Sequence, residues 1–276
     1  MHVSTTPLVD FDQANAEFWD ELCGNTFAQA LGITDHSLES LKRFDQAYLE
    51  FYPYLLDRVG LDQLAGKTVL EVGLGYGTLS QQLASVVGDY TGLDVAAGPV
   101  TMVNHRLRMQ NLPGRAIQGN ILNAPLPSDS LDAVVAIGCF HHTGDVQRCV
   151  DETYRLLKPG GLAKIMVYNR FSYRQWLKWP KVTLSAAMHE RKVVPGASSD
   201  QRRAYDVNSA GEAAPETVFL SARELANMFQ RYSNFACHKE NCDELPFGIH
   251  RRVSRQRLLP ILGRFAGLDL YIEARK

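Results

Sequence analysis

The sequence predicts an α/β fold with a parallel, doubly wound sheet. Between residues 68 and 168, short apolar and β-branched runs alternate with stretches in which apolar residues have helical spacing. The run at 68–72 ends in glycines, and the run at 131–138 is apolar almost throughout, as expected for a strand that is buried on both faces. Alternating strands and helices of this kind form parallel sheets covered by helices.

The composition is that of a folded globular protein. The chain has 276 residues, of which 45% are hydrophobic and 21% are charged. A net charge of −1 at pH 7 provides no positive field to hold a phosphate backbone, which argues against a nucleic-acid partner. The five cysteines lack C-x-x-C spacing, and no apolar stretch reaches the roughly 18 residues of a membrane span. We therefore expect reduced thiols, no membrane span and a cytoplasmic location.

Apolar spacing places the elements before residue 168. Two or three helices are expected between residues 11 and 56, where Phe18, Trp19, Tyr52 and Tyr54 are expected to pack a helical cap rather than to contact a ligand. A Pro-Gly-Gly turn is expected at 159–161. The alternating part comprises strands at 68–72, 90–95, 115–121, 131–138 and 162–168 and helices at 79–87, 100–111 and 146–157.

After residue 168 the regular alternation ends. A polar stretch at 196–215 predicts an inserted segment that is partly mobile. A helix is expected at 221–232, with Ser221 as its N-cap and Glu224 completing a capping box, and closing strands follow at 235–240 and 268–274. Between those strands we expect a short apolar helix with a basic face. This face is interpreted as solvated, with binding to an acidic substrate or a membrane surface as the alternative, and it comprises Arg251, Arg252, Arg255, Arg257 and Arg264.

A glycine-rich turn after the first strand is the strongest functional signal. Gly73, Gly75 and Gly77 permit a tight turn and let a ligand approach the backbone closely. The spacing departs from the G-x-G-x-x-G of dinucleotide sites, because Thr78 stands where the third glycine would be. Glu71, two residues before the turn, would repel a pyrophosphate and suits a positively charged ligand. The turn therefore points away from nucleotide phosphates.

With Glu71 followed by glycines at 73, 75 and 77, the chain resembles the class I methyltransferases that use S-adenosylmethionine, from about residue 64 to residue 276. The resemblance implies a Rossmann-like, doubly wound and mostly parallel seven-stranded sheet with an antiparallel last strand. It also implies an N-terminal helical cap or lid (1–63), a cofactor-binding core (64–170), an inserted substrate or lid segment after the fifth strand (171–220) and the C-terminal part of the core sheet (221–276).

The same resemblance assigns the cofactor contacts. In the family an acid at the end of the second strand holds both ribose hydroxyls, and Asp94 stands at that place. Asn120 replaces the family's usual acid near the adenine, and its carbonyl can still accept a hydrogen bond from the adenine amino group. The resemblance thus implies S-adenosyl-L-methionine as the cofactor, with contacts from Glu71, Gly73, Leu74, Gly75, Gly77, Asp94, Val95, Asn120, Ile121 and Ile137.

Two histidines follow the fourth strand, where the family has its reaction centre. The carboxyl ends of parallel strands bind ligands in open α/β sheets, and imidazole can take a proton near neutral pH. Strand alternation puts Ile137, Cys139 and His141 on one side, which favours His141 as a general base and leaves His142 as the alternate. In the alternative interpretation, either histidine caps the next helix or fills a polar niche.

These residues predict a methyltransferase that modifies an O or N atom of a small organic molecule in secondary metabolism, without a metal. The protein then has to align the acceptor, exclude water and remove a proton. Two alternatives stay open: a non-catalytic S-adenosylmethionine-binding regulatory subunit, and a nicotinamide-dependent oxidoreductase with degenerate glycine spacing. The identity of the methyl acceptor is left open, as is the oligomeric state, a homodimer included.

Overall fold

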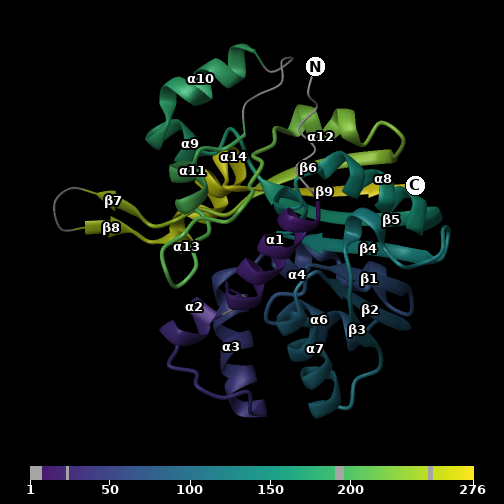
Figure 1. Ribbon diagram of the computed structural model, residues 1–276. Helices are drawn as coiled ribbons and strands as arrows, with labels where there is room; N and C mark the ends of the chain where they lie inside the picture. The colour runs from purple at the N-terminus through teal and green to yellow at the C-terminus, as the bar shows by residue number, and fades with distance from the viewer. Residues whose placement is uncertain (1–7, 23–24, 190–195, 248–250) are drawn as a thin grey trace.

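A seven-stranded sheet in the order β3-β2-β1-β4-β5-β9-β6 forms the centre of the computed structural model, which describes residues 8–22, 25–189, 196–247 and 251–276 (Figure 1). Strands β1 to β5 are parallel, and β9 runs antiparallel to both β5 and β6. The predicted doubly wound sheet with an antiparallel last strand is thus confirmed. The strands of this sheet are β1 (Thr68–Val72), β2 (Asp89–Asp94), β3 (Arg115–Gln118), β4 (Leu131–Ile137), β5 (Leu157–Tyr168), β6 (Ser233–Glu240) and β9 (Asp269–Arg275).

The central strands are buried on both faces, which explains their continuous apolar runs. In β1, Val69 packs into one hydrophobic cluster and Leu70 into the other, and Ala133 and Val134 of β4 divide in the same way. Full burial of a valine or leucine side chain contributes roughly 1.5–3 kcal/mol. Apolar residues on both sides of these strands therefore pack against both layers of helices.

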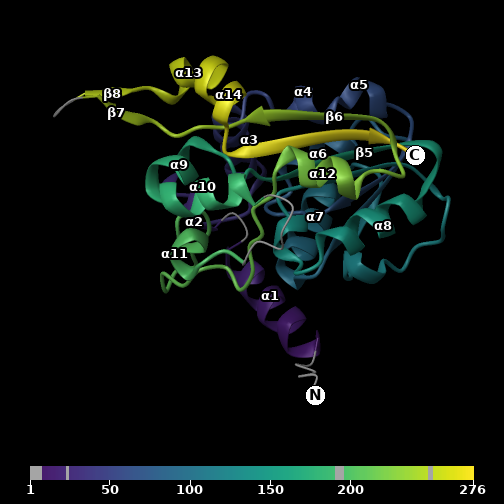
Figure 2. The same cartoon turned by 90° about the horizontal axis from the view of Figure 1, so that it is seen from above.

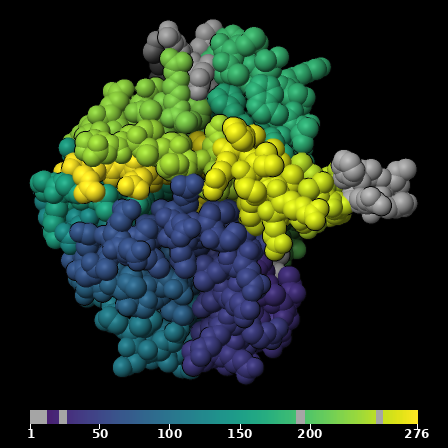
Figure 3. All heavy atoms as spheres, turned by 180° about the vertical axis from the view of Figure 1, so that it is seen from behind, coloured from purple at the N-terminus to yellow at the C-terminus, as the bar shows by residue number. Residues whose placement is uncertain are grey.

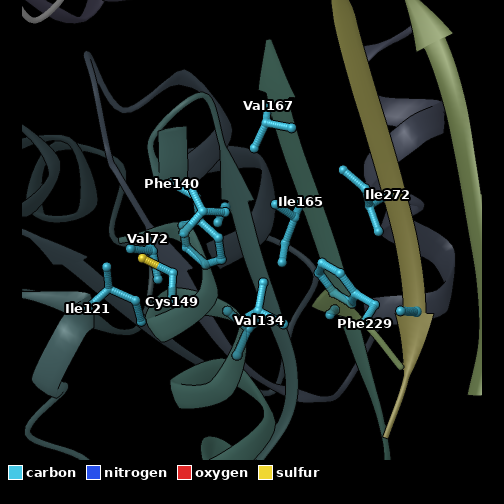
Figure 4. Close-up of a cluster of buried hydrophobic side chains, with 14 of the residues drawn as sticks. Val72, Ile121, Val134, Phe140, Cys149, Ile165, Val167, Phe229 and Ile272 are labelled. Carbon is cyan, nitrogen blue, oxygen red and sulfur yellow. The ribbon is translucent and has the colours of Figure 1, made fainter. Parts of the chain in front are cut away.

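Helices cover the two faces of the sheet. The cluster in Figure 4 joins one face to α8 (Val146–Leu156) and α12 (Ala222–Met228). The predicted capping box of α12 is confirmed, because Ser221 Oγ accepts from the Glu224 N–H and the Glu224 carboxylate accepts from the Ser221 N–H. The other face packs against α4 (Leu55–Val59), α5 (Leu61–Leu64), α6 (Thr78–Ala84) and α7 (Ala97–Met109).

Three N-terminal helices form the cap that the sequence predicted as two or three: α1 (Leu8–Leu22), α2 (Asn25–Ala30) and α3 (Leu38–Phe51). The Ser37 side chain caps α3 by accepting from the Ser40 N–H at 3.3 Å. Figure 2 shows α1 standing out from the body of the molecule at its N-terminal end. The ring of Phe44 in α3 lies 4.2 Å from that of Tyr76, so the cap packs directly on the glycine-rich turn.

The segment after β5 is more regular than expected. It contains three short helices, two of which begin after serine N-caps, Ser172 and Ser198. The helices are short and direct few large apolar residues toward the fold, so they lack the periodic signal of an amphipathic helix. They are α9 (Tyr173–Lys178), α10 (Pro180–Met188) and α11 (Ser199–Arg203).

The predicted helix for the basic residues near the C-terminus is partly wrong. Arg251 and Arg252 lie instead on β8 (Arg251–Val253), which pairs with β7 (Leu245–Phe247) in a separate two-stranded sheet. Residues Arg255 to Ala266 form one irregular helix with a π-helical turn, where Pro260 supplies no N–H to the regular helical ladder. Its parts are α13 (Arg255–Leu258), the π turn at Leu259–Gly263 and α14 (Arg264–Ala266).

Arg255 is buried rather than solvated, which corrects the interpretation of the basic face at this residue. Its guanidinium lies 4.1 Å from the ring centre of Phe51 and donates to the Phe51 carbonyl oxygen. In Figure 3 the C-terminal segment lies beside the N-terminal part of the chain. Arg255 therefore joins α13 to the end of α3.

A buried ion pair ties the helical cap to the core. Arg106 of α7 is fully buried and donates to both carboxylate oxygens of Asp45 in α3, at 3.0 and 2.9 Å. Asp45 also accepts from the Thr78 hydroxyl at the start of α6, at 2.7 Å. Three helices thus meet at one carboxylate.

We expect Asp45→Ala to lower the free energy of unfolding by about 3–5 kcal/mol, because it leaves the buried Arg106 charge without a counterion. Urea unfolding followed by circular dichroism measures this change. Asp57→Ala, which removes an exposed carboxylate on α4, is the control and should change stability by less than about 0.5 kcal/mol. Equal losses in the two variants would contradict the role of the ion pair.

Candidate functional site

A cavity of about 650 Å³ opens at the carboxyl ends of β1, β2 and β4, which is where open α/β sheets bind ligands. Its walls combine the strand ends with the helical cap and with Tyr205 and Asp206 of the segment after β5. Seven of the ten cofactor residues predicted from the sequence line it: Gly73, Gly75, Asp94, Val95, Asn120, Ile121 and Ile137.

The glycine turn brings the backbone to the cavity. Gly73 has φ +79°, and a Cβ built on it would lie 2.5 Å from the Cβ of Cys139 at the end of β4, so no side chain fits there. Gly75 has φ +52°, and a Cβ on it would meet nothing within 4 Å. A side chain at residue 75 would therefore fill open space, and its absence leaves a cradle for a ligand.

Asp94 stands at the end of β2 and is held rigidly. Its carboxylate oxygens accept from the backbone N–H groups of Leu74, at 2.7 Å, and Ala96, at 2.9 Å. Burial raises the pKa of Asp94, while these hydrogen bonds favour the ionised form. Each carboxylate oxygen has a second lone pair, so Asp94 can still accept hydrogen bonds from hydroxyl groups in the cavity.

The other three predicted cofactor residues, Glu71, Leu74 and Gly77, do not line the cavity. They support the glycine turn from behind. Glu71 is 2% exposed and accepts from the Tyr90 hydroxyl at 2.5 Å. Burial raises the pKa of Glu71 to about 7. Leu74 supplies its N–H to Asp94, and a Cβ on Gly77 would lie 2.8 Å from the Cδ of Arg106.

Asn120 follows β3 and lines the cavity beside Ile121. Its side-chain oxygen accepts from the Leu122 N–H at 2.9 Å and so caps the short 3₁₀ helix Ile121–Asn123. The cap orients the amide, whose oxygen keeps a second lone pair. Asn120 therefore has a structural function at the edge of the cavity as well as a place in its wall.

The two histidines occupy different positions, and strand alternation does not relate them. The strand β4 ends at Ile137, Gly138 adopts φ +83°, and residues 140–142 form a 3₁₀ helix, so the alternation argument for His141 is wrong. His141 is fully buried outside the cavity wall, with its ring centre 4.1 Å from that of His142 and 4.0 Å from that of Tyr168. His142 lines the cavity.

The contacts of His142 define its protonation. Its Nδ1 lies 2.8 Å from the Glu216 carbonyl oxygen, which can only accept, so Nδ1 carries the proton and Nε2 has a lone pair. Nε2 lies 3.6 Å from Asp206 Oδ2, too far for a direct hydrogen bond. Burial lowers the pKa of His142, although the Asp206 charge acts in the opposite direction. The imidazole is therefore neutral near pH 7.

Asp206 is a site residue that the sequence analysis missed. It lines the cavity and accepts from the Tyr168 hydroxyl at the end of β5, at 3.1 Å. Burial raises the pKa of its carboxyl group, and the neighbouring His142 opposes this shift. No local signal marks Asp206, because it stands in a polar segment far along the chain from the histidines it approaches.

Aromatic side chains wall the part of the cavity away from the glycine turn. Trp19 packs against His142 with ring centres 4.6 Å apart, so this tryptophan and Tyr52 contact the cavity as well as packing the cap. Both residues were predicted to pack the cap, whereas no place in a cavity was predicted for the other aromatic residues of the wall. The aromatic residues of the wall are Trp19, Phe27, Phe51, Tyr52 and Tyr205.

Comparisons with known proteins identify the domain that carries this cavity. A family model described as a methyltransferase domain matches residues 70–165, which include the glycine turn, Asp94, Asn120 and the histidines. This match supports a class I S-adenosylmethionine-dependent methyltransferase domain. A domain of this kind implies S-adenosyl-L-methionine as the cofactor and favours the methyltransferase prediction over a nicotinamide-dependent oxidoreductase.

Two curated relatives illustrate the sequence similarity of this chain. Demethylmenaquinone methyltransferase of Tropheryma whipplei is 32% identical over 122 residues, which are 42% of this chain and 50% of the relative. Ubiquinone biosynthesis O-methyltransferase of Photorhabdus laumondii is 29% identical over 151 residues, which are 54% of this chain and 60% of the relative. The chain thus spans about half the length of the curated relatives it matches.

Solved structures show the same fold. A chain of the complex between the Haloferax volcanii Trm112 methyltransferase activator and a methyltransferase aligns with a TM-score of 0.55 and 17% identity, over 84% of this chain and 92% of that chain. An S-adenosylmethionine-dependent methyltransferase from Mesorhizobium loti aligns with a TM-score of 0.52 and 15% identity, over 81% and 97%. At these identities the likeness concerns the fold alone.

The close contact of Gly73 with Cys139 leads to a test of the turn. We expect Gly73→Ala to weaken S-adenosylmethionine binding at least about tenfold, because the new Cβ must displace the end of β4 and strains a left-handed backbone. Isothermal titration calorimetry measures the affinity. Gly66→Ala is a matched control, since Gly66 has φ +70° and open space around its Cβ position. Unchanged binding in Gly73→Ala would show that the turn does not contact the cofactor.

Proposed function

We propose that this chain transfers the methyl group of S-adenosylmethionine to an O or N atom of a small organic acceptor, with His142 taking the proton that leaves. One observation carries the proposal: a single cavity joins the glycine turn and Asp94 to His142 and Asp206. Cofactor-binding groups and a neutral imidazole thus face the same space. Methyl transfer requires this arrangement, because acceptor and methyl donor must meet in line with water excluded.

The residues at the glycine-turn end of the cavity indicate how each part of the cofactor would be held. The cradle at Gly73 and Gly75 would receive the methionine part, Asp94 would accept from the ribose hydroxyls, and Asn120 with Ile121 would hold the adenine. The bound sulfonium would supply the methyl group as an electrophile. Because the sulfonium is a cation, the carboxylate of Asp94 and the nearby Glu71 favour its binding electrostatically.

His142 is a better candidate for the base than His141. Its neutral Nε2 has no hydrogen-bond partner among the described residues, whereas its Nδ1–H is fixed on the Glu216 carbonyl oxygen. When Nε2 takes a proton, the Asp206 carboxylate 3.6 Å away stabilises the imidazolium. His141 also lacks partners on both ring nitrogens, but it lies behind the wall and packs between His142 and Tyr168.

The helical cap and the segment after β5 would act as a lid and acceptor pocket, as the division at residues 1–63 and 171–220 predicts. Asn15 of α1 donates to the His142 carbonyl oxygen at 3.2 Å, and the Trp19 ring covers the His142 ring. Access to Nε2 therefore requires α1 to move outward and to return once the acceptor is bound. Asp206 supplies the opposite wall from the segment after β5.

The lining of the cavity favours a ring-shaped acceptor without a negative charge. Among the described lining residues there is no lysine or arginine to pair with a carboxylate or phosphate, whereas five aromatic rings provide flat apolar contacts. The two relatives named for menaquinone and ubiquinone synthesis agree with a small organic acceptor. A place in secondary metabolism and a homodimer remain predictions.

The first experiment is isothermal titration of the purified protein with S-adenosylmethionine and S-adenosylhomocysteine. We expect micromolar binding that falls at least about a hundredfold in Asp94→Ala, because a bidentate acceptor of two hydroxyl groups is lost. Asp89→Ala, at the exposed first residue of the same strand, is the control and should bind normally. A folded protein that releases no heat with either ligand would remove the proposed function.

A screen of phenols, hydroxy acids and amines would then provide an acceptor for testing the base. We expect His142→Gln to lower kcat roughly a hundredfold to ten-thousandfold while cofactor affinity is retained, and His141→Gln to lower it far less. A kcat reduced equally in both variants would assign the histidines a structural function.

The pH profile adds an independent readout. Burial holds the pKa of His142 below its ordinary value of 6.5, so Nε2 is free to accept a proton at and above neutral pH. We expect kcat to be level above pH 6.5 and to fall as pH decreases through the lowered pKa, since protonated His142 cannot act as a base. The same acid limb in His142→Gln would show that another group titrates.

A further inference from the structure

The two helices after β5 expose an unusual amount of apolar surface. Trp176 and Leu177 of α9 are 39% and 70% exposed, and Val182, Leu184 and Met188 of α10 are 52%, 51% and 66% exposed. Large contiguous apolar patches on a protein surface mark sites of interaction. We call residues 173–188 the α9–α10 arm, and Figure 1 shows α10 at the outer edge of the molecule.

The amphipathic pattern of α10 is inverted. The residues that face the fold are small or polar, namely Thr183 and Ala186, which are 2% and 6% exposed. Leu184 and Met188 are one helical turn apart and lie on the opposite side of the helix, toward solvent. The large apolar residues of α10 therefore contribute to an outer face and not to the core.

The charged residues of the α9–α10 arm are all basic. Lys178 and Lys181 are exposed beside the apolar residues, and the sequence from Tyr173 to His189 contains no aspartate or glutamate. The remaining cation, Arg174, is neutralised by a bidentate ion pair with Asp243 at 2.7 and 2.8 Å. Neither Lys178 nor Lys181 forms an ion pair with a described residue, although Lys178 lies near enough to Asp243 to lower the pKa of that carboxyl group.

We infer that the α9–α10 arm docks on an anionic lipid surface. Apolar side chains that enter the interface, a tryptophan at headgroup depth and lysines that reach lipid phosphates are the groups by which short helices bind the membrane surface without crossing it. A protein partner would meet the apolar residues equally well, but an arm whose own charged residues are all basic favours an extended negative surface.

The position of the arm links this surface to the cavity. The Ser172 Oγ at the start of α9 lies 3.2 Å from the hydroxyl of Tyr205, and the Arg174 guanidinium lies 4.4 Å from the centre of the Tyr205 ring. Tyr205 lines the aromatic end of the cavity. A lipid surface bound by the arm would therefore lie near the end of the cavity where an apolar acceptor is expected.

Co-sedimentation of the full chain with vesicles tests this inference. We expect binding to vesicles of equal parts phosphatidylcholine and phosphatidylglycerol, at least about tenfold weaker binding to phosphatidylcholine alone, and weakening at high salt. The triple variant Leu177→Ser, Leu184→Ser, Met188→Ser and the double variant Lys178→Glu, Lys181→Glu should each reduce binding at least about tenfold. The positions changed are exposed, and retained S-adenosylmethionine affinity confirms that each variant is folded.

Matched controls change the same residue types elsewhere. Met109→Ser with Val86→Ser removes exposed apolar groups from α7 and the end of α6, and Lys42→Glu with Arg108→Glu reverses two exposed charges. Both should bind vesicles normally.

No vesicle binding by the full chain would overturn the inference, as would loss of binding only on changing Ile261 and Phe265 of the C-terminal helix. A change of oligomeric state in the triple variant, without a change in vesicle binding, would assign the arm to self-association. The assay contains neither cofactor nor acceptor, so its failure leaves the proposed function intact.

Discussion

The contact between the ends of β1 and β4 is the constraint on which the cavity depends. The two strands lie side by side in the sheet, and the chain leaves them toward opposite faces, to α6 and to α8. A crevice forms where adjacent strands diverge in this way. Gly73 and Cys139 close its floor, because Gly73 has no side chain and Cys139 donates from its Sγ to the Val72 carbonyl oxygen at 3.2 Å. The cradle exists because these two strand ends meet so closely.

The carboxyl groups near the floor of the cavity favour a bound cation. Glu71 and Asp94 are both buried near the glycine turn, and burial raises the pKa of each, that of Glu71 to about 7. Two carboxyl groups held together in a poorly solvated place repel one another when ionised. A cation in the cavity would relieve this repulsion and lower both pKa values. The site is thus better matched to a sulfonium than to a phosphate, as the acid before the glycine turn indicated from the sequence.

The sequence predicted most of the features that depend on a few neighbouring residues. It predicted few of the contacts between segments that are distant along the chain. The strands β1 and β4 and the capping box of α12 were predictable because periodicity and capping chemistry are encoded within a few residues, as with Ser221 and Glu224. Seven of the cofactor residues that the family resemblance implied also line the cavity. The alternation argument that favoured His141 was wrong because Gly138 ends the strand alternation one residue after β4. Asp206 was missed because only the fold brings it close to His142.

Tyr168 joins the proposed acceptor end of the cavity to the sheet. Tyr168 ends β5, its hydroxyl holds Asp206, and its ring packs on His141, which in turn packs on His142. The segment after β5 is thereby positioned relative to the histidines by the sheet itself, although most of its residues have no regular pattern. The proposed cofactor end is built from β1, β2 and β3 and the proposed acceptor end from the cap and this segment, so changes in the segment would alter the acceptor without disturbing the cofactor cradle. The position of Tyr168 preserves the alignment between the two ends.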